Sequence, residues 1–123
     1  MAKPASNGIS ALTPSALDHP SARDARTLIR SAVKAALATS DHQNGHPYAS
    51  LILAGTTFEG APVTLISDLA VHTRNIKQRP QVSMLFDGTA DNGDPMAGGR
   101  VSVSGTMEPI ADPDEREAAS VRF

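Results

Sequence analysis

The sequence contains no cysteine and no tryptophan among its 123 residues. The absence of cysteine excludes disulfide bonds, metal sites built from thiolates and enzymes that use a cysteine nucleophile. Aromatic residues make up only 3% of the chain, so aliphatic side chains must fill the interior. Hydrophobic residues reach 40% and charged residues 20%, which is typical of a soluble globular protein.

Long hydrophobic runs and an excess of positive charge are also missing. No apolar stretch approaches the roughly 20 residues that a membrane-spanning helix needs, and the first 20 residues lack the apolar core of a signal peptide. The 11 lysine and arginine residues against 13 aspartate and glutamate residues give a net charge of −2. We therefore expect a cytoplasmic protein that binds neither membranes nor nucleic acid.

The length is that of one domain. Met1–Pro20 is rich in Ala, Ser and Pro and offers little apolar surface, so we expect a flexible N-terminal tail or an arm that lies on a partner. The predicted domain is the remainder, residues 21–123. The chain ends at Phe123 inside an unfinished helical pattern, from which we expect a C-terminally truncated form or a partner that covers this end.

Apolar periodicity predicts helices joined to antiparallel strands. Ser21–Lys34 has the spacing of an amphipathic helix, and another helix begins at Asp112 with Pro113 in its first position. Strands are expected at Ala35–Ser40, Pro47–Ala54, Val63–Ser67, Val82–Asp87 and Arg100–Met107. Asn44-Gly45 predicts a hairpin because both residues accept a positive φ. This order favours a small antiparallel barrel with helices over a parallel doubly wound sheet.

The stretch Ser67–Pro80 joins two of these strands and carries a dense group of polar side chains. It predicts a short helix capped by Ser67 or Asp68 and ended before Pro80. One hydroxyl and up to three cationic groups fall within two turns: His72, Thr73, Arg74 and Lys77. Free amides and the helix dipole make such an N-terminus suitable for a phosphate. Two interpretations stay open, an anion site or a solvent-exposed face that carries cations.

Two of the predicted strands carry polar residues of interest. Ser50 is a small polar residue in an apolar strand, both faces of which we expect to be mostly buried, so its hydroxyl needs a backbone group or a ligand as partner. In Arg100–Met107 the polar residues alternate with Val101 and Val103. Arg100 and the polar residues that follow it therefore face water, a ligand or another subunit.

Four stretches in this order resemble the pyridoxamine 5′-phosphate oxidase-like family of FMN-binding split barrels, and in particular its haem-utilisation branch. They are PYASLILA, LISDLAVHTRNIKQRPQVSMLF, DPMAGGRVSVSG and the helix that begins DPDER. The resemblance implies a mainly β (α+β) fold, a six-stranded antiparallel split β-barrel with flanking helices. It also implies a homodimer that holds FMN in a groove between the subunits.

By position, the resemblance implies a set of cofactor-binding residues: Ser50, Ser67, Asp68, His72, Thr73, Arg74 and Arg100. Ser50 stands where the oxidase proper has a phosphate-binding arginine, and His72 where it has a lysine. Arg100 stands where a polar side chain approaches the flavin ring. FMN affinity then depends on Arg74, Thr73 and backbone amides. With this resemblance the anion site is favoured over the exposed face.

Three functions follow for such a chain. The first is an FMN-dependent oxidoreductase of unknown substrate, and the second is a haem-binding or haem-utilisation protein on the same scaffold. The third is a non-catalytic dimeric module that has lost both ligands. The sequence assigns no catalytic acid, base or nucleophile, and we predict no metal ligands.

Overall fold

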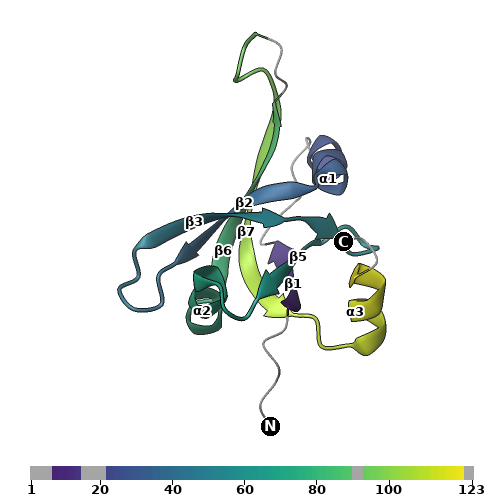
Figure 1. Cartoon of the computed structure of the whole chain (residues 1–123). Helices are drawn as coiled ribbons and strands as arrows, with labels where there is room; N and C mark the ends of the chain where they lie inside the picture. The colour runs from purple at the N-terminus through teal and green to yellow at the C-terminus, as the bar shows by residue number, and fades with distance from the viewer. Residues whose placement is uncertain (1–6, 15–21, 90–92, 121–123) are drawn as a thin grey trace.

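The computed structural model describes residues 7–14, 22–89 and 93–120, which form a curled antiparallel sheet with flanking helices (Figure 1). The strands are β1 (Asn7–Pro14), β2 (Lys34–Ser40), β3 (Pro47–Leu53), β4 (Gly55–Thr56), β5 (Pro62–Ser67), β6 (Gln81–Thr89) and β7 (Gly98–Pro109). The helices are α1 (Ala22–Ser31), α2 (Val71–Gln78) and α3 (Pro113–Ser120). Within these residues the strand order is β3-β2-β6-β7-β1-β5-β4. The mainly β class is confirmed, with seven strands where six were expected.

The sheet curls until its two ends meet in one bent stretch of chain, Pro47–Thr56. Its first part is β3, which pairs with β2, and its last part is β4, which pairs with β5. Ala54 lies buried at the bend, and its N–H donates to the carbonyl of Val33 at 3.1 Å. The buried hydroxyl of Thr64 on β5 donates to the carbonyl of Leu53 at 2.6 Å. This hydrogen bond ties β5 to the end of β3.

Strand β1 lies within the segment for which a flexible tail was predicted. It pairs with β5 on one side, where Ala11 is opposite Val63, and with β7 on the other, where Ala11 is opposite Glu108. The prediction is therefore wrong for residues 7–14, and the rest of the segment lies outside the described residues. The first part of β1 pairs with β5 and the last part with β7, which provides backbone partners along the strand. The low apolar content of this segment does not reveal such pairing.

Aliphatic side chains fill the core, as the scarcity of aromatic residues requires, and Phe86 is the aromatic residue that the described part of the chain contributes to it. Helix α1 contributes Ile29, which is 2% exposed, and its Leu28 and Ala32 pack against the same cluster. The strands contribute Leu37, Ile52, Ile66, Val82, Met84, Phe86, Val103 and Met107.

Helix α3 packs outside this core, where Ala119 and Ile110 contact Val63 of β5. Its start agrees with the sequence prediction. The carboxylate of Asp112 accepts the N–H of Glu115 at 3.2 Å, and Pro113 is the first helical residue. A side-chain cap of this kind satisfies an amide that has no partner inside the helix.

The predicted hairpin between β2 and β3 is present, with a longer turn than Asn44-Gly45 alone would make. Gly45 has a φ of +76°, whereas the φ of Asn44 is not positive. The N–H of Asp41 donates to the carbonyl of His46 at 2.7 Å and closes the loop. Backbone N–H groups of Gln43 and Asn44 bond to the Asp41 carboxylate at 2.9 and 3.1 Å and hold its pKa below the ordinary value.

The outer face of the sheet exposes apolar side chains, contrary to the expectation that both faces of the second strand are buried. Leu51 and Leu53 on β3 are 71% and 57% exposed, and Leu85 on β6 is 42% exposed. Leu51 and Leu85 both lie opposite Ala36, so all three leucines share one face. We call these three side chains the outer leucine patch. β3 is an edge strand among the described residues, and none of them covers these leucines with a second layer.

Gly88 of β6 and Gly99 of β7 lie opposite each other. The methyl group of an alanine would fit at Gly99 but not at Gly88. At Gly88 it would lie 2.6 Å from Leu28 Cδ1 and 2.7 Å from the Gly99 carbonyl, whereas at Gly99 no atom lies within 4 Å. We expect Gly88→Ala to displace α1 and lower the free energy of unfolding by about 1–3 kcal/mol. The matched Gly99→Ala should change it by less than about 0.5 kcal/mol. Urea denaturation followed by circular dichroism measures both, and equal losses would contradict this packing.

Candidate functional site

Helix α2 follows β5 and begins without a side-chain cap. Its N-cap residue is Ala70, and the helix ends at Gln78, before Pro80 as predicted. The prediction that Ser67 or Asp68 caps it is wrong, because a turn separates both residues from the helix. The Ser67 hydroxyl instead accepts the N–H of Leu69 at 3.2 Å. The first-turn amides therefore have no side-chain cap. The N–H of Thr73 donates to the Ala70 carbonyl at 3.2 Å, and the N–H groups of Val71 and His72 before it are suited to binding an anion.

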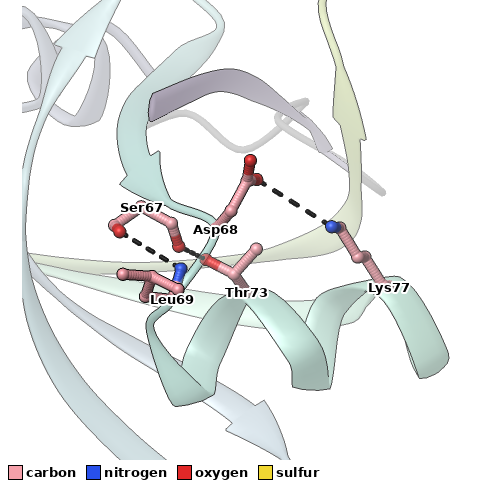
Figure 2. A network of polar contacts seen from close by, with 5 residues as sticks. All are labelled: Ser67, Asp68, Leu69, Thr73 and Lys77. Carbon is pink, nitrogen blue, oxygen red and sulfur yellow. Dashed lines mark hydrogen bonds and ion pairs between the residues drawn. The ribbon is translucent and has the colours of Figure 1, made fainter. Parts of the chain in front are cut away.

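A small polar network closes the connection between β5 and α2 (Figure 2). The hydroxyl of Thr73, a residue that is 3% exposed, donates to the carbonyl of Ser67. Lys77 Nζ reaches back along the helix to within 3.9 Å of the Asp68 carboxylate. Both charged side chains are solvated, so this ion pair contributes little to stability. The hydroxyl proton of Thr73 is committed to Ser67, which leaves Thr73 no proton to donate to a ligand.

The structure brings together Ser50 and His72, which lie 22 residues apart in the sequence. The hydroxyl of Ser50 on β3 lies 3.2 Å from Nδ1 of His72 on the first turn of α2. The other ring nitrogen, Nε2, is buried and has no hydrogen-bond partner among the described residues. Burial lowers the pKa of His72 from its ordinary value, because it disfavours the charged ring. A buried ring nitrogen without a partner is rare and calls for an explanation, such as an ordered water, an ion or a ligand.

The two arginines of the predicted site lie apart from each other. Arg74 is exposed on α2, directly after the buried Thr73. Arg100 lies on β7 and is paired with Asp87 of β6. Asp87 is six residues beyond Gln81, the residue at which β6 begins after α2. At the rise of a β-strand this is about 20 Å from that end of the sheet. The guanidinium of Arg100 donates to the carbonyl of Met96 at 3.0 Å. Within one chain, Arg100 does not join the residues of α2.

Asn75 is a fully buried residue of α2 that the sequence analysis missed. Its Oδ1 accepts the backbone N–H of His42 at 2.8 Å and lies 2.8 Å from Nδ1 of the same histidine. Its Nδ2 donates to Thr39 Oγ1 at 3.0 Å. These bonds fasten α2 to β2 and its hairpin, and they fix the orientation of His72 one turn earlier. The available signal was helical spacing, because Asn75 follows His72 by three residues and therefore shares its face.

A groove of about 480 Å³ lies on the sheet, and α2 contributes no residue to it. Small and hydroxyl-bearing side chains from β2, β6 and β7 form much of its lining, among them Ala38, Ser40, Ser83, Ser104 and Thr106. Ser83 and Ser104 are bonded to each other through their hydroxyl groups at 2.5 Å. None of the seven predicted cofactor residues lines this groove. It adjoins the outer leucine patch, since Ala38 follows Ala36 on the same face of β2.

Comparison with known proteins gives a family and several structural neighbours. Residues 22–123 match the family model described as pyridoxamine 5′-phosphate oxidase. A heme binding protein from Mycobacterium smegmatis superposes with a TM-score of 0.75 at 30% identity, over 88% of this chain and 45% of that protein. The protein Atu2129 of unknown function from Agrobacterium tumefaciens has a TM-score of 0.69 at 29% identity, over 85% of this chain and 44% of that protein.

HutZ, the heme storage protein from Vibrio cholerae, shares the fold at 23% identity with a TM-score of 0.60, over 78% of this chain and 68% of that protein. The chain thus spans less than half the length of the Mycobacterium and Agrobacterium proteins. A search of curated proteins found no match. Among the described residues, every helix is too short or too polar to cross a membrane.

We expect Asn75→Ala to lower the free energy of unfolding by about 2–3 kcal/mol, because it leaves the N–H of His42 and the hydroxyl of Thr39 without their partner. Gln78→Ala is the matched control, since Gln78 is an exposed residue on the same helix, and it should cost less than about 0.5 kcal/mol. Urea denaturation measures both variants. Similar losses would show that Asn75 does not anchor α2.

Proposed function

Because the chain belongs to the pyridoxamine 5′-phosphate oxidase family, we propose that it binds FMN where β3 meets the first turn of α2. We call this position the α2 corner and define it by Ser50, His72, Arg74 and the uncapped first-turn amides. The curled antiparallel sheet with flanking helices confirms the split-barrel fold. The observation that carries the proposal is the contact between Ser50 and His72, which leaves one buried ring nitrogen without a partner.

The residues of the α2 corner fit a phosphate group. Arg74 supplies a permanent charge that forms bidentate, charge-assisted hydrogen bonds to phosphate oxygens. The helix start supplies the backbone N–H groups of Val71 and His72, which have no side-chain cap, and the ring of His72 supplies a further N–H. Ser50 and His72 replace two permanent cations, so binding is weaker than with arginine and lysine at these positions. FMN when bound supplies electron transfer, which makes a flavin-dependent oxidoreductase the activity that this site supports.

A homodimer is the assembly that the outer face of the sheet supports. The outer leucine patch exposes large apolar side chains beside a groove of small residues, and such a face is typical of an interface between subunits. Arg100 lies on this same face, since it is opposite Asp87, two residues after Leu85. A second copy seated on the patch would therefore approach Arg100 and bring it towards a shared cofactor.

Haem is the second candidate cofactor, and a specific observation favours it. The Mycobacterium smegmatis structure that matches 88% of this chain at 30% identity is that of a heme binding protein. The two propionate groups of haem carry negative charge, as the phosphate of FMN does. Arg74 and the amides of the α2 corner would serve either anion. The two candidates differ in the rest of the cofactor, which spectroscopy distinguishes.

Titration of the purified protein with FMN and, separately, with haemin tests these proposals. We expect stoichiometric quenching of flavin fluorescence, weakened about tenfold or more in Arg74→Ala because a charge-assisted hydrogen bond is lost. Arg23→Ala, which removes an equally exposed arginine on α1, should bind FMN as the unchanged protein does. A Soret shift with haemin and no response to FMN would assign haem instead. No response to either cofactor would contradict both proposals and favour the third function, a non-catalytic dimeric module.

The proposed dimer is tested by Leu51→Arg, which places a charge in the centre of the outer leucine patch. We expect a dimer for the unchanged protein and a monomer for this variant in size-exclusion chromatography with light scattering. Phe58→Arg is the control, because Phe58 is 84% exposed in the turn after β4 and lies outside the patch. A monomeric unchanged protein, or an equal effect of both substitutions, would contradict the assignment of this face.

A further inference from the structure

His72 differs from Arg74 at the α2 corner because its charge depends on pH. In the free chain, a protonated ring would carry two N–H groups. The one at Nδ1 has the hydroxyl of Ser50 as a partner at 3.2 Å. The one at Nε2 would be buried with no acceptor among the described residues. The free chain therefore favours the neutral ring.

Charged neighbours do not reverse this preference. The titratable groups on α2 and on the segments around the ring are Lys34, Asp41, His42, His46, Tyr48, Asp68, Arg74, Lys77 and Arg79. Asp68 is paired with Lys77, and the ring of His42 is bonded to Asn75. Arg74 is exposed to solvent. Burial is the cause that lowers the pKa of His72, and no charged group contributes to the shift.

We propose that FMN binding at the α2 corner is coupled to the uptake of one proton by His72, so that falling pH strengthens recognition of the phosphate. This inference rests on the proposed function. A phosphate oxygen gives the Nε2 proton the acceptor that the free chain lacks, in a charge-assisted hydrogen bond. Because Nε2 is covered in the free chain, the ring has to shift as the phosphate enters. The positive charge of the protonated ring favours that shift.

The direction of the pH dependence follows from linkage. The pKa of His72 lies below its ordinary value of 6.5 in the free chain, and a bound phosphate raises it. Between the two pKa values each bound FMN brings one proton, so the affinity falls by about tenfold per pH unit as the pH rises. Riboflavin has no phosphate and gains nothing from the proton. Discrimination between FMN and riboflavin therefore increases as the pH falls.

Calorimetric titration with FMN at pH 7, in two phosphate-free buffers of different ionisation enthalpy, counts the protons taken up. We expect close to one proton per FMN for the unchanged protein and close to none for His72→Lys, whose charge is permanent. Between pH 6.5 and 8.5, Kd should rise by about tenfold per pH unit at its steepest in the unchanged protein and stay nearly flat in His72→Lys. Riboflavin, as the second probe, should show no proton uptake.

A second variant, His72→Gln, controls for the possibility that the lysine of His72→Lys disturbs the packing around position 72. His72→Gln keeps a hydrogen-bond donor of similar size without a titrating group, so it should match the unchanged protein at pH 8.5 and gain no affinity at pH 6.5. FMN binding without proton uptake, or with the same pH profile in His72→Gln as in the unchanged protein, overturns this inference alone. Absence of FMN binding to the unchanged protein and to His72→Lys at every pH overturns the proposed function as well.

Discussion

The barrel depends on the bend at Ala54, where one stretch of chain leaves β2 and joins β5. Strands on either side of the bend pair with opposite ends of the sheet, so the bend converts an open sheet into a curled one. The buried hydroxyl of Thr64 holds the bend by its hydrogen bond to the carbonyl of Leu53. This bond links the last residue of β3 to β5 at the point where the chain turns away from β2. The curl also leaves the rest of β3 as an edge, beside which α2 lies.

The position of α2 relative to that edge follows from buried polar bonds more than from apolar packing. Ile76 is the large apolar residue that α2 contributes to the core, whereas Asn75 makes its hydrogen bonds to β2 and the hairpin. Hydrogen bonds are directional, so they set the rotation of a short helix about its own axis. That rotation turns His72 towards Ser50 and leaves Arg74 exposed. The orientation of His72 at the candidate site therefore depends on Asn75, which is not one of the proposed binding residues.

Elements with local signals could be predicted from the sequence, and those that depend on distant partners could not. Strands β2, β3, β5, β6 and β7 were expected close to where they lie, because alternation and turn residues mark them locally, whereas the two-residue β4 was not predicted. Strand β1 was missed because its pairing with β5 and β7 leaves no mark in its own composition. The caps expected from Ser67 and Asp68 failed because a turn comes before the helix. The family resemblance implied one site that holds both Ser50 and His72. Their side chains are in contact, which their spacing of 22 residues could not have predicted.

The pairing of serine with histidine at the α2 corner has a chemical logic that arginine at position 50 would not have. A serine hydroxyl both donates and accepts, so Ser50 can donate to Nδ1 of a neutral His72 or accept from Nδ1–H of a protonated one. The Nδ1 side of the ring is thus satisfied in either state, and only Nε2 distinguishes the free chain from the bound one. An arginine at position 50 would repel the protonated ring and offers no acceptor. In the proposed site, the serine at position 50 and the titratable histidine at position 72 therefore act together, because a bound phosphate would stabilise the charge on His72 while Ser50 serves the ring in either state.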